Sequence, residues 1–78
     1  MVVQKQKSKK KRKANSLIQR AAINIKYCRV QKGISQEKLE NETGLYISRY
    51  ESGKHDMTLT TIYILGKHLS VRPCDLLK

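Results

Sequence analysis

The chain has no tryptophan and no phenylalanine, and it contains one proline, two cysteines and only six acidic residues among its 78. No stretch approaches the roughly 18 apolar residues that a membrane-spanning helix needs, so none is predicted. The basic start is not followed by an apolar segment, so no signal peptide is predicted either. Cys28 and Cys74 are too few for a disulfide framework and lack a CxxC spacing, which favours reduced thiols and a cytoplasmic protein.

Motifs for catalysis and for metal binding are also missing. His55 and His68 do not combine with the two cysteines at a zinc-ligand spacing. Glu37, Glu40 and Glu42 lie close together in the sequence, but no paired acid–base environment accompanies them. The four glycines stand far apart and form no phosphate-binding loop. We therefore predict no enzymatic activity, no cofactor and no metal site.

Positive charge, in contrast, is abundant: 17 lysines and arginines give a formal net charge of +11. Many of them lie near the N-terminus, in a segment with few apolar side chains. We therefore predict a disordered basic N-terminal arm over 1–15 and a folded domain over 16–78. The excess of positive charge predicts a polyanionic partner, and nucleic acid is a better candidate than an anionic membrane. We expect the arm to hold DNA phosphates, with a solubilising tail as the alternative. The arm residues assigned to DNA are Lys9, Lys10, Lys11, Arg12 and Lys13.

A chain of this length buries too little surface to be very stable alone, and it would gain from a second subunit. Apolar residues recur at helical spacing and no strand pattern is present, so we predict an all-α bundle of about five short helices. The first helix is expected to have Asn15 or Ser16 as its N-cap and to run to about Lys32. Gly33 and Ile34 then supply a Schellman-type stop.

Two short helices separated by a glycine turn follow. The side chain of Ser35 is expected to cap a helix over 36–43, which ends at Gly44. A second helix over 46–52 ends at Gly53. This arrangement is typical of a helix-turn-helix, in which the second helix lies in the major groove of DNA.

The last third of the chain predicts two more helical segments. Thr58 is expected to cap a helix over 59–69, in which Gly66 allows close packing. Pro73 suits the first position of a final helical turn over 73–77. The expected inward-facing residues are Leu59, Ile62, Leu65 and Leu69, with Leu76 and Leu77 facing inward or towards a second subunit.

Several sequence words occur in one register, among them GISQEKL over 33–39, ISRYESGK over 47–54 and DLL over 75–77. In this order and spacing, residues 25–77 resemble the phage-repressor, Cro-type helix-turn-helix family, also called the XRE class. The resemblance implies a lambda-repressor-like fold and a transcriptional regulator that binds a palindromic operator on double-stranded DNA as a homodimer. Many members are phage repressors, and antitoxin members also bind a toxin.

The resemblance also implies roles for single residues. It gives Gln36 a phosphate contact and a bracing role towards the recognition helix, and it pairs Arg29 with Glu51. The planar fork of Arg49 fits guanine, a contact worth about 1–3 kcal/mol, with an ion pair to Glu51 or Glu42, or a plain phosphate contact, as the alternatives. Besides the arm, the expected DNA-contacting residues are Ser35, Gln36, Tyr46, Ser48, Arg49 and Lys54.

Two features depart from the family pattern. Between Gly44 and Gly53 the chain is about three residues shorter than usual, at the turn and the start of the recognition helix. Glu40 follows Leu39 where the family usually has alanine, so this glutamate is expected to point elsewhere or to push the two helices apart. Both features weaken the assignment of base contacts and leave the fold prediction unchanged.

Two other functions remain open at this point. An exposed apolar patch beyond the core would favour an antitoxin-like or other protein-interaction module. The candidate residues for such a patch are Tyr63, Ile64 and Leu77. An RNA-binding protein could use the basic arm, but the arm contains none of the four tyrosines that could stack on bases. Membrane binding through the arm is weaker still, because nothing apolar accompanies the charge.

Overall fold

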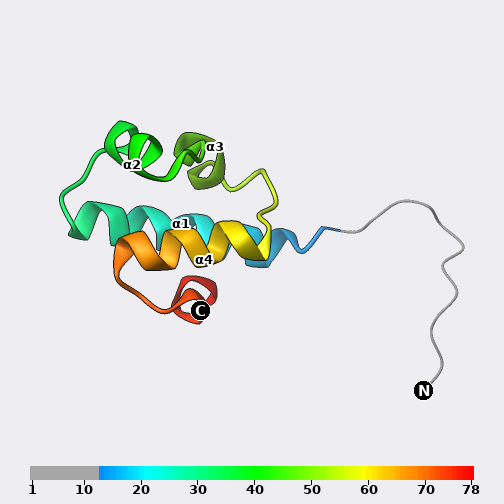
Figure 1. Ribbon diagram of the computed structural model, residues 1–78. Helices are drawn as coiled ribbons and strands as arrows, with labels where there is room; N and C mark the ends of the chain where they lie inside the picture. Colours follow the sequence, from blue (N-terminus) through cyan, green and yellow to red (C-terminus); the bar gives the residue numbers. More distant parts are fainter. Residues whose placement is uncertain (1–12) are drawn as a thin grey trace, which may run out of the picture.

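The computed structural model describes residues 13–78, so the predicted contacts of Lys9 to Arg12 lie outside the described residues. All regular structure in this part is helical, which confirms the all-α prediction. Helices α1 and α4 lie side by side, α2 and α3 cover one side of them, and η1 covers the other (Figure 1). The elements are α1 (Asn15–Gln31), α2 (Gln36–Thr43), α3 (Ile47–Glu51), α4 (Leu59–Leu69) and the 3₁₀ helix η1 (Pro73–Leu77).

Local sequence signals determine most helix ends as predicted. After α1, the N–H of Gly33 donates to the carbonyl of Val30 at 2.9 Å and that of Ile34 donates to Arg29 at 3.3 Å. With Gly33 at φ 71°, these bonds form the Schellman stop. The hydroxyl of Ser35 accepts the N–H of Lys38 at 3.0 Å and thereby caps α2.

The start of α1 differs from the prediction. Helical geometry begins at Asn15 itself, and Ala14 is the N-cap residue without a side-chain hydrogen bond. The carbonyl of Ala14 already accepts the N–H of Ile18 at 2.9 Å. The backbone hydrogen bonds of the helix therefore start one residue earlier than they would with Asn15 as the N-cap. The predicted cap at Asn15 or Ser16 is wrong.

The core receives one fully buried aliphatic side chain from each of the five elements. These residues are Ile25, Leu39, Ile47, Leu65 and Leu76. Ile62 and Leu69 on α4 are also buried, as predicted, but Leu59 is 84% exposed. As the first residue of α4, Leu59 lies at the edge of the core, where it lines an apolar pocket.

Close packing of α4 against the following segment depends on Gly66. A Cβ atom at this position would lie 3.0 Å from the carbonyl oxygen of Val71 and 3.2 Å from the nitrogen of Pro73. Both are backbone atoms that cannot rotate away, which confirms that Gly66 allows the close approach. None of the helices in residues 13–78 is long and apolar enough to cross a membrane.

The cap of α4 gives a direct test of these local signals. The hydroxyl of Thr58 accepts the N–H of Thr61 at 3.1 Å, so Thr58→Ala should lower the free energy of unfolding by about 1 kcal/mol. The matched control is Thr60→Ala, because Thr60 is exposed, lies in the same turn and caps nothing. Urea denaturation of both variants measures the difference, and equal losses would contradict the capping role.

Candidate nucleic-acid interface

The outer layer of α2 and α3 is joined to α1 through one carboxylate, that of Glu51. Its oxygens accept the Nε of Arg29 at 2.6 Å and the Nη2 at 3.1 Å. They also accept the side-chain amide of Gln36 at 2.9 Å, while the Nη1 of Arg29 donates to the carbonyl of Ile34 at 2.8 Å. The hydrogen bond to Glu51 raises the pKa of Arg29, although burial acts in the opposite direction.

This network sets the position of α3 from its C-terminal end. Only 4% of the Glu51 side chain is exposed, so water does not compete for its oxygens. The network confirms the ion pair between Arg29 and Glu51 and the bracing role of Gln36. A phosphate contact by Gln36 stays a prediction, and its half-buried position at the first residue of α2 is compatible with one.

The N-terminal end of α3 is held by a residue whose role the sequence did not suggest. Tyr46 is the N-cap residue of α3 but supplies no side-chain hydrogen bond. Instead, the carboxylate of Glu40 on α2 accepts the N–H of Ser48 at 3.2 Å. The glutamate that replaces the usual alanine therefore caps the next helix. No local sequence pattern indicates this cap, because it joins two different helices.

The exposed surface of α3 carries three of the predicted DNA-contacting residues, Tyr46, Ser48 and Arg49. The guanidinium of Arg49 lies 5.4 Å from the ring centroid of Tyr46, a cation–π contact that needs no carboxylate. The predicted alternative, an ion pair of Arg49 with an acidic neighbour, is wrong. Glu51 is bound by Arg29, and Glu42 pairs with Lys38 at 3.1 Å.

The remaining predicted contacts lie around this surface. Ser35 and Lys54 are exposed, before α2 and after α3 respectively. The hydroxyl of Ser35 accepts the N–H of Lys38, so its own proton stays available to an acceptor. The ammonium of Lys13 donates to the carbonyl of Lys54 at 3.3 Å. Lys13 therefore lies beside the loop that follows α3.

Ile47 on α3 is fully buried and Tyr50 is half-buried. Within residues 13–78, no group of three or more histidine, cysteine, aspartate or glutamate side chains could hold a metal ion.

Residues 25–76 match the profile of the helix-turn-helix family, which is more than half of the chain. The chain belongs to this family, in its Cro-type class. The crystal structure of a hypothetical transcription factor from Neisseria, NHTF, is similar to this protein, with a TM-score of 0.76 and 30% sequence identity. The similarity covers 88% of this chain and 84% of the Neisseria chain. A search of curated proteins gave no significant match.

In this helix-turn-helix protein, α3 occupies the position of the recognition helix. It spans only five residues, in agreement with the short distance between Gly44 and Gly53 in the sequence. A helix of this length is unstable in isolation, so its geometry depends on the contacts that hold its two ends. Glu40 holds the first end and Glu51 the second.

Removal of the Glu51 carboxylate should be the more damaging of two matched changes. Glu51→Ala leaves Arg29 buried without its partner and should lower the free energy of unfolding by about 3 kcal/mol. Glu42→Ala breaks an exposed pair with Lys38 and should cost less than about 0.5 kcal/mol. Chemical denaturation of both variants at neutral pH measures the two values. Similar small losses would show that the buried network does not hold α3.

Proposed function

We propose that this helix-turn-helix protein is a sequence-specific transcriptional regulator that binds a palindromic DNA operator as a homodimer. The observation that carries this proposal is the exposed surface of α3, formed by Tyr46, Ser48 and Arg49, on a helix whose orientation is set by the buried Arg29–Glu51 pair. A fixed helix orientation favours base recognition, since contacts to base edges require defined geometry. The net charge of +11 favours a polyanionic partner.

In the proposed complex, the side chains divide into two groups. Arg49 contacts a guanine with its guanidinium fork, which lies over the ring of Tyr46. Ser48 offers a hydroxyl to a neighbouring base or phosphate. The residues proposed to contact phosphates, which position the protein without reading sequence, are Ser35, Gln36, Lys54, Lys9, Lys10, Lys11, Arg12 and Lys13.

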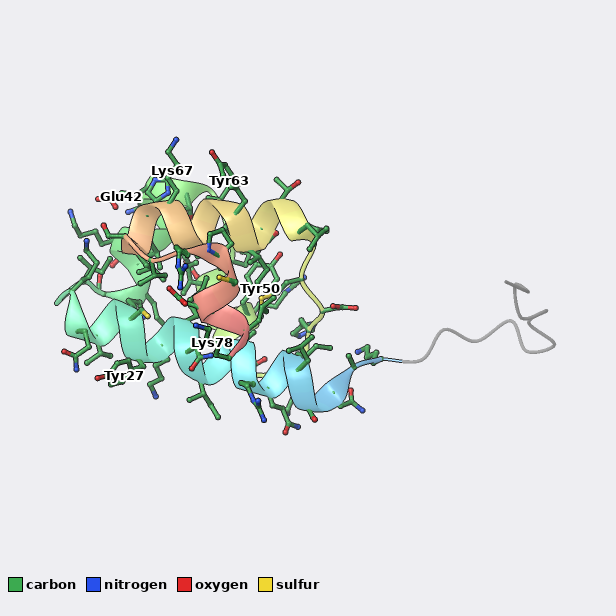
Figure 2. All side chains as sticks on the ribbon, turned by 90° about the horizontal axis from the view of Figure 1, so that it is seen from below. Tyr27, Glu42, Tyr50, Tyr63, Lys67 and Lys78 are labelled. Carbon is green, nitrogen blue, oxygen red and sulfur yellow. The ribbon has the colours of Figure 1, made fainter. Side chains whose placement is uncertain are left out.

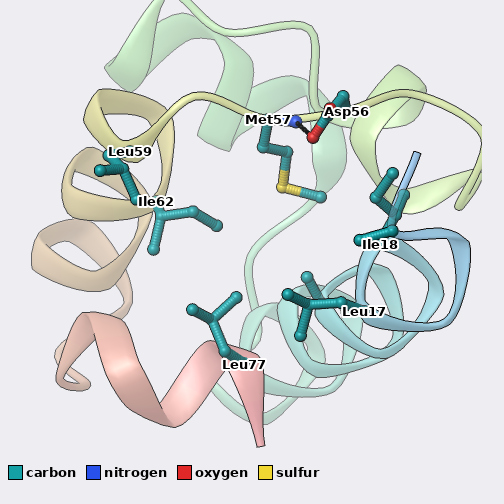
Figure 3. Close-up of a pocket in the computed structure, with 9 residues that line it drawn as sticks. Leu17, Ile18, Asp56, Met57, Leu59, Ile62 and Leu77 are labelled. Atoms are coloured by element: carbon teal, nitrogen blue, oxygen red, sulfur yellow. Dashed lines mark hydrogen bonds between the residues drawn. The ribbon is translucent and has the colours of Figure 1, made fainter. Parts of the chain in front are cut away.

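A second subunit is supported by the apolar pocket at the edge of the core. The pocket has a volume of about 120 Å³, and Figure 3 shows that Leu59 and Ile62 of α4, Leu17 of α1 and Leu77 of η1 line it. Leu59 therefore combines a protruding apolar side chain with an adjacent hollow. A two-fold axis at this surface would let each subunit insert Leu59 into the pocket of the other. The two recognition helices would then need to lie about 34 Å apart.

The role of Arg49 predicts a loss of discrimination between DNA sequences. On an operator selected from a random pool, Arg49→Ala should reduce the preference over random duplex at least about tenfold, because a guanine contact is lost. The matched control is Arg20→Ala, since Arg20 is an exposed arginine on α1. Fluorescence anisotropy titrations at several salt concentrations measure both affinities.

The same titrations separate base contacts from phosphate contacts. Replacing Lys9 to Lys13 by neutral residues should weaken binding to operator and random DNA equally and flatten the salt dependence, by up to about 0.9 in slope for each lost phosphate contact. If Arg49→Ala also weakened both duplexes equally, α3 would not read sequence. Equal binding of both duplexes by the wild type would contradict the proposed function itself.

The proposed dimer surface predicts an effect on subunit association. Leu59→Asp places a charge at an apolar contact and should shift the protein towards monomer by at least about tenfold in dissociation constant. Because Leu59 is exposed in the single subunit, the fold should be unaffected. Sedimentation equilibrium measures the shift, with the exposed Tyr63→Asp as control. An unchanged dimer, or a wild type that stays monomeric on its operator, would place the subunit contact elsewhere or remove it.

A further inference from the structure

The solvent-facing side of α1 carries an apolar stripe that core packing does not explain. The stripe consists of Ile23, Tyr27 and Val30, which are 68%, 63% and 55% exposed. Their spacing of i, i+4 and i+7 places them on one side of the helix. Tyr27 points away from the bundle, on the side opposite α4 (Figure 2). The residues that α1 contributes to the interior lie on its other side, namely Ile18, Ala21, Ala22, Ile25 and Arg29.

The charge around this stripe has a single sign. Arg20 and Lys26 are exposed at its flanks, one on each side along the helix wheel. Neither lies within ion-pair distance of a carboxylate among residues 13–78. From Asn15 to Gln31, α1 contains no aspartate and no glutamate. The stripe is therefore an apolar ridge between unpaired cations.

From this arrangement we propose that the stripe binds an acidic amphipathic helix of another protein. Apolar residues at i, i+4 and i+7 pack against a partner helix with the same spacing, as in a coiled-coil seam. Glutamates beside that seam would reach Arg20 and Lys26. A second copy of this chain fits poorly, because two α1 helices would bring the same cations together and neither would supply an anion.

The stripe is separate from the two surfaces of the proposed regulator. On one side of α1, Ala22 lies beside Gly53 at the end of α3, which places the DNA-facing layer there. On the other side, the amide of Asn24 donates to the carbonyl of Leu76 in η1 at 2.9 Å. The stripe lies between these contacts on the solvent side. A partner helix bound to it would leave both α3 and the apolar pocket free, so the regulator could hold DNA and this partner together.

The stripe is also more exposed than the patch expected from the sequence at Tyr63, Ile64 and Leu77. Ile64 and Leu77 are half-buried, and the ammonium of Lys67 lies 5.9 Å from the ring centroid of Tyr63. Tyr63 is 56% exposed on α4, outside the stripe. Tyr63→Ser is therefore a matched control for the change of Tyr27 in the stripe.

The test uses the full chain and a fluorescein-labelled peptide of about three heptads, with leucine at the a and d positions and glutamate at e and g. Anisotropy should show saturable binding, and the double change Ile23→Ser and Tyr27→Ser should weaken it at least about tenfold, because tyrosine is enriched among the residues that dominate such contacts. Tyr63→Ser should leave the affinity unchanged. Circular dichroism and DNA affinity of each variant show whether the fold and the DNA-binding layer are intact.

Two further peptides separate the stripe from the basic arm. A scrambled peptide of the same composition keeps the negative charge but has no apolar face, and a peptide with lysine at e and g keeps the face but reverses the charge. Both should bind at least about tenfold more weakly than the acidic amphipathic peptide. Equal binding of the scrambled peptide would assign the interaction to the arm and overturn the proposal. The proposal would also be overturned if the stripe variant lost the protein's own dimer, because a second copy of the chain would then be the occupant. Absence of peptide binding at about 1 mM would overturn it as well.

Discussion

The guanidinium of Arg29 lies where α1 meets the layer of α2 and α3, and its hydrogen bonds to Glu51 connect these elements. Hydrophobic contacts such as those of Ile47 attract α3 to the core, but they do not set its rotation tightly, because they are not directional. The paired hydrogen bonds between guanidinium and carboxylate are directional. Gln36 donates to the same carboxylate, so α2 is held in the same frame. The orientation of the surface that we propose to face DNA depends on this network.

A buried ion pair is often no more stabilising than an apolar contact of the same size, because both charges lose their hydration. The contribution of the Arg29–Glu51 pair is therefore better understood as one of geometry. With five residues, α3 has too few internal hydrogen bonds to form alone. Glu40 satisfies a free N–H at its start and Glu51 anchors its end, so the surrounding chain supplies what the short helix lacks. The DNA contacts that we propose for Ser48 and Arg49 depend on this single turn.

Helix α1 organises the remaining surfaces around itself. Its buried side meets the core, and the first turns of that side line the pocket that we assign to a second subunit. Its solvent side carries the stripe of Ile23, Tyr27 and Val30. These surfaces lie on different sides of one helix, so DNA, a second subunit and an acidic partner helix would not compete for the same atoms. The excess of positive charge favours acidic partners at the stripe and at the DNA-facing layer alike.

Much of the fold could be predicted from sequence, since the signals involved act over a few residues. Ser35 and Thr58 determine the starts of α2 and α4, and Gly33 and Gly44 end helices through the left-handed conformation. Helical spacing identified Leu65 and Leu69 as interior residues, and the words over 33–39 and 47–54 identified the family. Local signals failed at the start of α1, where an alanine with no capping side chain precedes the helix.

Tertiary structure alone decided the contacts between residues distant in sequence. Sequence could not show that Glu40 caps α3, that Leu59 stays outside the core, or that Arg49 stacks on Tyr46. It also did not show that a second apolar stripe, of Ile23, Tyr27 and Val30, stays exposed on α1. The physical reason is that hydrophobic spacing shows which residues share a side of a helix, whereas burial depends on which neighbouring helix covers that side. The sequence thus determined the helices and the family, and the packing of the helices decided which side chains are left to meet a partner.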